Sequence, residues 1–495
     1  MKGFDKLKIK RFSISAICIV AVLLIAALFS LTAKSQIMIE YSDSTDSSVF
    51  LYVARSILNG EVPYRDTFDH KGPLMYLLNV IALSISPEVG LWIVELATLS
   101  AAFLIMYKLS CLFCKNTTSV FVVLSIVPAL ARYFDGGNLI EEYALPFIAG
   151  ALYIFTDYFL NNKITKLRLV ICGICLGAVL MLRINMIAVW MVMCIGVLWQ
   201  CLFNRDYKRI WFFLRYFLLG LFVSIVPFLI WLMAKGALKE FWNDYFIFNL
   251  FYSSDSERAN SFAKLNSFSS FLHYMWTTIA LSVTAVSYLK KKRMLDLLYL
   301  FCLLVTLLLI CISGQLYSHY GMSVIPLLVA PLAYIGKSCE DSWDKDQFSN
   351  ILIVICLMAY MVLPTWQTLF DNAVASHKDY GLDKTNTTVA AISSWIQENT
   401  SPDDKIIVCG NWNVIYNESE RFAASQYSYQ TPICIISEEM EKEFYEELNE
   451  NKPAAIVLPS DYYAYGKMQN FIDTYGYILA TNDSVAGSYA LYLLP

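Results

Sequence analysis

YSDSTDSSVFLYVARSILNGEVPYRDTFDHKGP, residues 41–73, is a dense polar stretch between long apolar runs. Runs of about 17–25 apolar residues recur along the chain, long enough to cross a hydrocarbon core of roughly 30 Å. The 495 residues are 57% hydrophobic and 16% charged, whereas soluble domains carry about 25% charged residues. The sequence therefore predicts a mostly α-helical, polytopic membrane protein, with this polar stretch at a membrane surface.

The N-terminus predicts the orientation of the chain. The basic segment MKGFDKLKIKRF precedes an apolar run over 13–33, which is longer than a signal-peptide core and lacks a small-residue cleavage site. We expect a retained anchor with a cytoplasmic N-terminus, because basic flanks stay inside. Residues 41–73 then lie outside.

Residues 74–86 form an apolar run that is too short to span the bilayer. Counting it as a span would also place every later basic loop outside, against the positive-inside rule. We therefore predict a helix lying in the outer interface. The basic loops that this reading keeps inside are centred on Lys163–Arg168, Arg205–Arg209 and Lys290–Arg293.

With that helix in the interface, about eleven spans remain. They run near 13–33, 88–113, 117–131, 142–160, 168–182, 186–203, 210–234, 270–289, 294–313, 321–336 and 350–366. The prediction is a plasma-membrane protein with a transmembrane module over 1–370, a first external loop over 34–87 and an external C-terminus.

The composition changes after residue 370. Helical patterns cover Asn386–Asn399 and Ser437–Asn449, and short strand patterns cover 405–409, 454–458 and 489–493. We predict a small extracytoplasmic α/β domain over 371–495. A Cys409–Cys434 disulfide is possible in an oxidising compartment. The CxxC pairs at Cys111 and Cys172 lie in or beside apolar helices without a nearby His, so no metal site is predicted there.

Asp46 begins an amphipathic helix whose polar face includes Arg55. An Asp at a helix start is commonly an N-cap. Asp43 and its neighbours are alternative caps, however, which leaves Asp46 available for chemistry. Farther along, Asp69, His70 and Lys71 precede Gly72-Pro73, a sequence suited to opening the interfacial helix. Lys71 is either a snorkelling lysine or a ligand contact.

Three other external segments carry charged or polar residues. Glu141 and Glu142 begin a span, where they suit either the helix dipole or a site. Arg183 lies between two apolar runs and would bind either bulk lipid phosphate or the phosphate of a specific lipid substrate. His319-Tyr320 occupies a short loop, and Trp242–Tyr252 is an aromatic interfacial segment.

These polar residues all fall on one predicted membrane face. A transporter would instead place polar groups and broken helices near the midplane. No GxxxxGK[ST] or GxGxxG nucleotide motif occurs on the cytoplasmic side, and no nucleic-acid partner is expected. The pattern favours a site in the outer leaflet.

The residues Asp46-x-x-x-Phe50, Ala54-Arg55, Asn59-Gly60 and Lys71-Gly72-Pro73 resemble the first external loop of the GT-C glycosyltransferases. The chain is most similar to glycosyltransferase family 39, the protein O-mannosyltransferase and lipid A aminoarabinose transferase group. The resemblance covers roughly the first 340 residues. His70 and Gly72 depart from the family pattern, in which an acidic residue and a proline are frequent.

The resemblance implies a sugar donor linked to a polyprenyl phosphate or diphosphate, and an acceptor that is a glycan, lipid or protein. It implies that Asp46, or alternatively Asp43, is the general base, and that Glu141 or Glu142 orients the acceptor or sugar. Lys71 and Arg183 would hold the lipid phosphate, assisted by His319. Arg55, Asp69, His70 and Tyr320 complete the expected substrate-binding set. A divalent cation is a possible cofactor. The alternatives are an O-antigen-type polymerase or ligase, a lipid-linked sugar flippase, and a membrane-anchored sensor.

Overall fold

The computed structural model describes residues 2–35, 45–250, 261–273, 275–312, 317–345, 387–480 and 489–495, with isolated positions between 352 and 371. Internal contacts divide the chain into two units. The helical unit comprises Met1–Gln36, Trp92–Phe228 and Ser256–Lys378. The mixed unit comprises Ile37–Leu91, Leu229–Asp255 and Asp379–Pro495.

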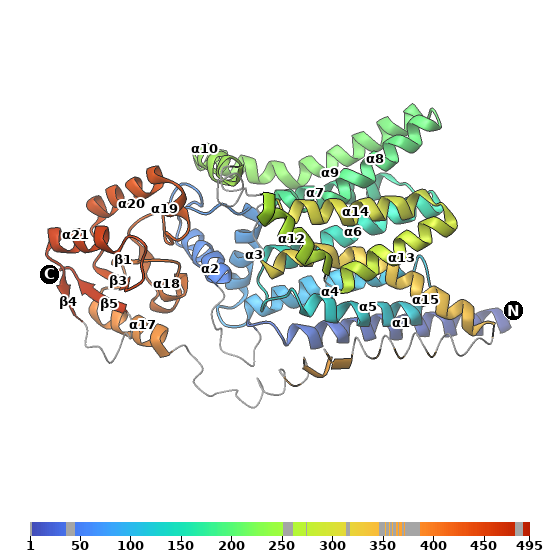
Figure 1. The fold of residues 1–495 in the computed structure, drawn as a ribbon, viewed down its shortest axis with the longest axis horizontal. Coiled ribbons are helices and arrows are strands. Elements are labelled where there is room, and N and C mark those ends of the chain that lie inside the picture. Colours follow the sequence, from blue (N-terminus) through green and yellow to red (C-terminus); the bar gives the residue numbers. More distant parts are fainter. Residues whose placement is uncertain are drawn as a thin grey trace. The chain divides into compact units, whose positions relative to one another are not determined.

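Long apolar helices build the helical unit and run side by side (Figure 1). Helix α6 is central, because it contacts α7, α8, α14 and the 3-10 helix η3. The helices that belong wholly or mainly to this unit are α1 Lys2–Ser30, α4 Gly90–Ser110, α5 Asn116–Ala131, α6 Ile140–Asn161, α7 Lys166–Leu180, η1 Ile184–Met186, α8 Ala188–Phe203, α9 Tyr207–Ala234, α12 Ser261–His273, α13 Met275–Lys291, α14 Met294–Ile310, η3 Ser318–Leu328 and α15 Val329–Trp343.

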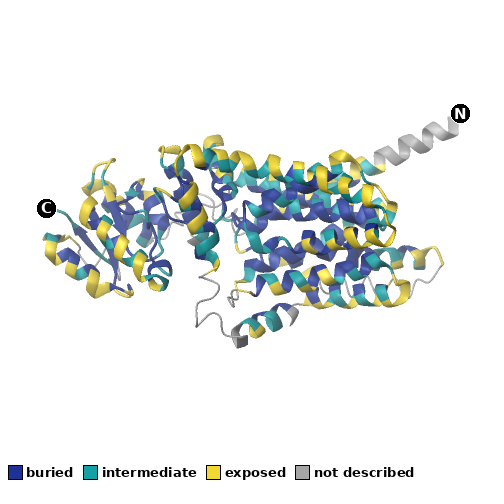
Figure 2. Ribbon diagram, turned by 90° about the horizontal axis from the view of Figure 1, so that it is seen from above, coloured by how far each residue is buried: buried dark blue, intermediate teal, exposed yellow. Residues whose placement is uncertain are grey.

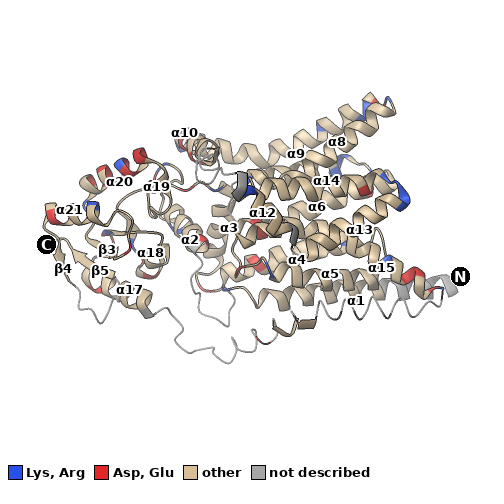
Figure 3. Cartoon of the chain, in the orientation of Figure 1, with Lys and Arg blue, Asp and Glu red and all other residues tan. Residues whose placement is uncertain are grey.

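Four helices among the described residues are long and apolar enough to cross a membrane: Gly90–Ser110, Ile140–Asn161, Tyr207–Ala234 and Ser318–Trp343. Five shorter apolar helices accompany them. Charged residues lie mostly near helix ends (Figure 3), as expected where the middle of a helix meets hydrocarbon. The chain is a membrane protein. The total of about eleven spans and the orientation of the chain in the membrane stay predictions. Most of the span predicted at 350–366 lies outside the described residues.

A five-stranded sheet forms the core of the mixed unit, in the order β2-β1-β3-β5-β4. The strands are β1 Lys405–Val408, β2 Phe422–Ala423, β3 Ala455–Pro459, β4 Ile478–Leu479 and β5 Tyr489–Leu493. β1 is parallel to β2 and β3, whereas β5 is antiparallel to β3 and β4. All five residues of β3 are buried, and buried positions run through the sheet in Figure 2. A strand that is buried on both faces usually has a continuous apolar sequence, and Ala455–Pro459 has such a sequence.

Helices cover the sheet of the mixed unit. α17 Thr387–Asn399 contacts α18 Asn413–Ser419. A second group comprises α19 Ile433–Ile436, α20 Glu438–Asn451 and α21 Tyr465–Tyr475. The sequence predicted α17, α20, β1, β3 and β5 to within a few residues. It missed β2 and β4, which have only two residues each, and the helices α18, α19 and α21. Cys409 and Cys434 are both buried free thiols, so the possible disulfide is not formed.

The first loop contributes α2 Thr45–Leu58 and α3 Pro73–Ile85 to the mixed unit. The sequence predicts that residues 34–87 are the first external loop of the transmembrane module, whereas contacts in the structure group 37–91 with the C-terminal residues. The polar face of α2 explains the difference. The Tyr52 hydroxyl accepts a hydrogen bond from Ala423 N at 3.0 Å, and Asn417 Nδ2 donates to Ser48 O at 2.9 Å. This face therefore packs against protein.

Candidate functional site

Arg183 and Glu141 form a buried ion pair in the helical unit. Glu141 lies in the first turn of α6 and is 3% exposed. Arg183 precedes η1; its Nη1 reaches Glu141 Oε1 at 2.5 Å, and its Nη2 donates to the Tyr320 hydroxyl at 2.6 Å. The guanidinium also lies over the Tyr320 ring, 4.1 Å from the centroid. Three segments predicted separately from sequence thus meet at one point.

The loop before α6 turns through four consecutive left-handed residues, Asp135 to Asn138. Gly137 has φ +88°, and a Cβ there would lie 2.1 Å from Glu95 Oε1. Glycine is required because a side chain would meet both an unfavourable φ and that carboxylate. Glu95 Oε1 in turn accepts a hydrogen bond from Asn138 N at 2.6 Å, so α4 holds the loop.

Glu95 and Glu142 are fully buried neighbours within this region. Ser35 Oγ donates to Glu95 Oε2, while neither carboxylate oxygen of Glu142 has a hydrogen bond of ordinary geometry to a described residue. Buried carboxyl groups are costly without partners. The Glu95–Glu142 pair is therefore a candidate functional feature, because buried polar groups are normally satisfied.

His319 is the second residue of η3 and lies beside the loop that precedes α6. Its Nδ1 lies 3.9 Å from Asp135 Oδ2, and its ring stacks on Tyr317 at 5.6 Å. The hydrogen bond from His319 lowers the pKa of Asp135 below its usual value, opposed by partial burial. Arg183, Glu141, Tyr320 and His319 thus all lie at the end of the helical unit where α6 begins.

Asp69 is the centre of a second cluster, in the mixed unit. It is 1% exposed; its Oδ2 accepts from the Tyr76 hydroxyl at 2.8 Å, and its Oδ1 accepts from the Tyr429 hydroxyl at 2.9 Å. His70 Nδ1 and Lys71 Nζ lie 3.6 and 3.9 Å from Oδ1. One buried carboxylate therefore orders the imidazole of His70 and the ammonium group of Lys71, and it connects the first loop to the C-terminal residues.

His70 and Lys71 remain partly exposed, at 13% and 17% of their side chains. Lys71 Nζ lies 2.5 Å from His70 Nε2. Asn249 Nδ2 fixes the backbone by donating to His70 O at 2.8 Å. The Lys71 ammonium is thus held beside Asp69 and His70 while part of its side chain stays open to solvent.

A π-helix, η2 Trp242–Phe248, adjoins this cluster and follows the short helix α10 Leu238–Phe241. π-Helices occur frequently at functional sites. Asp244 of η2 is half-buried, and burial raises its pKa to about 8, reinforced by Asp69, Glu240 and Glu443. Asp244 is thus largely protonated at neutral pH. Trp242 is exposed. Interfacial anchoring by Trp242–Tyr252 stays a prediction, and residues 251 and 252 lie outside the described part.

Asp46 is the second residue of α2, so it lies within the first turn. It is half-buried, and no described residue hydrogen-bonds to its side chain. Arg55, by contrast, donates to Tyr416 O at 2.8 Å and to Asn417 Oδ1 at 3.2 Å. Arg55 therefore fastens α2 to α18. Asp43 lies outside the described residues.

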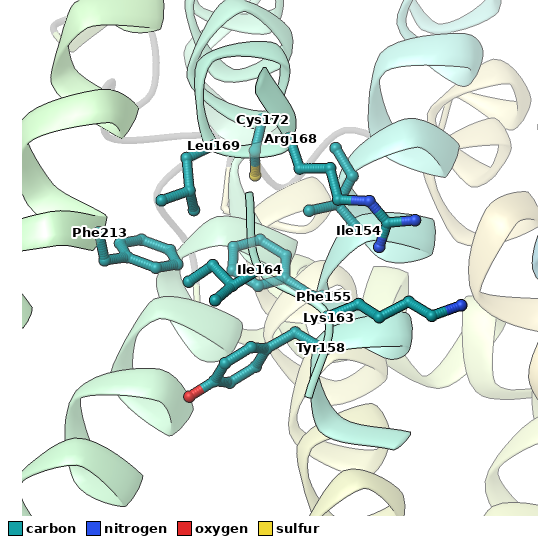
Figure 4. A pocket seen from close by; sticks show the side chains of 9 residues that line it. All are labelled: Ile154, Phe155, Tyr158, Lys163, Ile164, Arg168, Leu169, Cys172 and Phe213. Atoms are coloured by element: carbon teal, nitrogen blue, oxygen red, sulfur yellow. The ribbon is translucent and has the colours of Figure 1, made fainter. Parts of the chain in front are cut away.

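A pocket lies at the opposite end of α6 from Glu141, between α6, α7 and α9. Figure 4 shows Lys163 and Arg168 with their charged ends directed away from Phe213. Arg168 Nη1 is paired with Asp157 Oδ2 at 2.5 Å. None of the residues predicted from sequence lines this pocket. It is therefore separate from both clusters.

Sequence reasoning missed several residues of the two clusters: Ser35, Tyr76, Glu95, Asp135, Asn138, Asp244 and Tyr429. Glu95 could have been found from sequence, because an acidic residue inside an apolar helix is a candidate functional residue. No sequence pattern indicates a functional role for Tyr429. Among the described residues no three His, Cys, Asp or Glu side chains come together as a metal site would require.

Solved structures share the fold of this chain. ArnT from Cupriavidus metallidurans, bound to undecaprenyl phosphate, matches with a TM-score of 0.62 and 14% identity over 97% of this chain and 98% of that one. The archaeal oligosaccharyltransferase AglB from Archaeoglobus fulgidus, in complex with an inhibitory peptide and a dolichol-phosphate, matches with a TM-score of 0.52 and 13% identity. That match covers 96% of this chain and 74% of AglB. These likenesses confirm the predicted GT-C fold.

Sequence comparison identifies the family. No curated protein sequence matches the chain significantly. A family model described as "Putative competence-induced protein Ccs4 N-terminal domain" matches residues 6–347. The match covers most of the helical unit and the whole first loop, which is more than half of the chain. The chain therefore belongs to this Ccs4 N-terminal domain family.

Proposed function

We propose that this protein is an integral membrane glycosyltransferase that moves a sugar from a polyprenyl-phosphate-linked donor to an acceptor on the outer face of the membrane. The observation that carries the proposal is the GT-C fold, shared over 97% of the chain with an ArnT structure bound to undecaprenyl phosphate. The ordered, partly exposed cation Lys71 on the first loop, held beside Asp69 and His70, supports it.

Asp46 is proposed as the general base. Its carboxylate would remove the proton from the acceptor hydroxyl as that oxygen bonds to the anomeric carbon. The bond from the anomeric carbon to the donor phosphate oxygen breaks, and the electron pair leaves with the phosphate. Support for Asp46 over a purely capping role comes from its place inside the first turn, where it has no described hydrogen-bond partner. Inversion at the anomeric carbon is expected from the family resemblance.

Lys71 is proposed to stabilise the departing phosphate, because developing charge on a leaving oxygen needs a fixed cation. A leaving phosphate held in this way requires no general acid. Arg183 is proposed for the same role toward lipid phosphate, with Glu141 and Tyr320 already fixing its guanidinium. Glu142, with its unpartnered buried oxygens, is proposed to orient the acceptor or sugar.

Mass spectrometry of lipid that co-purifies with the protein tests this proposal. We expect a polyprenyl phosphate, with or without its sugar, to be enriched over the bulk phospholipids of the same membrane. Lys71→Ala should lose that enrichment, because it removes an ammonium group aimed at the phosphate. The exposed Lys239→Ala serves as the control. Co-purified lipid with the bulk composition would contradict the proposal.

A further inference from the structure

The chain after β2 joins the C-terminal residues to the first loop and is held at two points. Phe68 N donates a hydrogen bond to Gln426 O at 2.9 Å, which ties this segment to the loop. Gln430 ties it to the turn after β1, because its Oε1 accepts from Gly410 N and its backbone N donates to Gly410 O, both at 2.9 Å. Tyr429 lies in the short stretch between these two points. Its backbone is therefore fixed on both sides.

The Tyr429 hydroxyl is one of three donors that satisfy the buried carboxylate of Asp69. Oδ2 accepts from the Tyr76 hydroxyl at 2.8 Å. Oδ1 accepts from His70 N at 2.7 Å and from the Tyr429 hydroxyl at 2.9 Å. Two donors fill the two lone-pair positions of one carboxylate oxygen. Lys71 Nζ lies 3.9 Å from the same Oδ1, outside the range of about 2.7–3.2 Å over which an N–H group donates to oxygen.

The Tyr429 hydroxyl therefore fills the position on Asp69 that lies nearest to the Lys71 ammonium group. A shift of about 1 Å would bring Nζ into hydrogen-bond distance of Oδ1. With the hydroxyl in place, Nζ lies 2.5 Å from His70 Nε2. The Lys71 backbone is held separately, because its carbonyl oxygen accepts from the Tyr64 hydroxyl at 2.7 Å. Tyr429 thus controls the end of the Lys71 side chain and not the course of the loop.

Tyr429 itself is 4% exposed, so its side chain has almost no surface with which to contact a donor. Its effect on the reaction must pass through Asp69. We infer that Tyr429 is a positioning residue for Lys71: its hydroxyl keeps the ammonium group out of a direct hydrogen bond with Asp69 and available to the donor phosphate. This inference rests on the role proposed above for Lys71. It gives the C-terminal residues a part in the reaction.

Chemical labelling of Lys71 tests the positioning in the absence of any donor. The full-length protein in nanodiscs is treated with an amine-reactive acetylating reagent, and mass spectrometry follows the modification of each lysine. Tyr429→Phe removes only the hydroxyl and opens the Oδ1 position to Lys71 Nζ. We expect labelling of Lys71 to slow at least about threefold, because a directly bonded carboxylate favours the charged, unreactive ammonium form. The exposed Lys239 is the internal reference.

Donor kinetics connect the position of Lys71 to sugar transfer. Tyr429→Phe should lower kcat/KM for the donor at least about threefold. In a protein that already carries Lys71→Ala, the same substitution should cause no further loss, because the group that Tyr429 positions is gone. A purely structural role for Tyr429 would instead add its loss to that of Lys71→Ala.

Tyr427→Phe is the matched control. Tyr427 is also buried, and its hydroxyl donates to a carboxylate, Glu443 Oε2, at 2.6 Å. This variant loses the same kind of bond two residues away, so any general loss of stability should be similar. Its Lys71 labelling and donor kinetics should stay near those of the parent.

The outcomes separate this inference from the proposed function. The inference is overturned if Tyr429→Phe leaves Lys71 labelling unchanged, or if Tyr427→Phe slows it equally. It is also overturned if the losses from Tyr429→Phe and Lys71→Ala are additive. If labelling slows as expected but Lys71→Ala leaves the donor kinetics unchanged, the role proposed for Lys71 toward phosphate is wrong, while the control of its side chain by Tyr429 stands.

Discussion

Asp46→Asn is expected to lower the rate of sugar transfer by about 100- to 10,000-fold, the usual contribution of a general base. Asparagine keeps the shape of the side chain but cannot take the acceptor proton. The protein should remain folded, because Asp46 is half-buried and no described residue hydrogen-bonds to its side chain. The loss of a favourable charge at the start of α2 should cost no more than about 1 kcal/mol. The measurement is turnover of purified variant and parent protein at saturating donor.

Asp66→Asn is the matched control for that substitution. Asp66 belongs to the same loop, but its carboxylate is paired with the exposed Arg65 at 2.7 Å. Transfer by this variant should stay near the parental rate. If Asp46→Asn also retains near-normal turnover, Asp46 only supplies charge to the first turn of its helix, and the proposed base is wrong.

Arg183→Ala is expected to raise the donor KM and to lower the stability of the protein. The stability loss follows from Glu141, which is 3% exposed and would lose its cation. Removing one partner of a buried ion pair typically costs about 3–5 kcal/mol. The rise in KM follows from the proposed contact with lipid phosphate. Both quantities can be measured on one preparation, by thermal unfolding and by donor titration.

Arg168→Ala separates the two effects, because it breaks a comparable pair at the other end of α6. Asp157 is 1% exposed and pairs with Arg168 at 2.5 Å. This variant should lose stability too, but its donor KM should match that of the parent. An unchanged KM in Arg183→Ala, or an equal rise in both variants, would count against phosphate binding by Arg183.

Much of the fold could be predicted because its signals are local. The apolar runs identify the helices, and the buried strand over 455–459 is itself a short apolar run. β2 and β4 could not be predicted, because two residues give no periodicity. The grouping of the first loop with the C-terminal residues was also out of reach. It rests on contacts between residues far apart in sequence, such as Phe68 N donating to Gln426 O at 2.9 Å.

The candidate site likewise contains residues that could be predicted from sequence and residues that could not. Charged residues in otherwise apolar surroundings, such as Arg183 and Glu141, are conspicuous in sequence, and the structure brings them together. Arg55 is equally conspicuous, yet it fastens α2 to α18. Tyr429 and Asn138 are ordinary polar residues whose importance comes from the carboxylates they contact, Asp69 and Glu95. Sequence thus indicates which charges are unusual, whereas the structure identifies their partners.

The most direct test of the proposed function is the fate of the lipid carrier. Purified protein would be reconstituted into liposomes with a polyprenyl-phosphate-linked sugar pool and an acceptor extract from its native envelope. Liquid chromatography with mass spectrometry would then follow the carrier. Glycosyl transfer predicts that the free polyprenyl phosphate increases in step with the sugar gained by the acceptor, and that Asp46→Asn abolishes both. A carrier that stays glycosylated, or that only changes leaflet, would contradict the account.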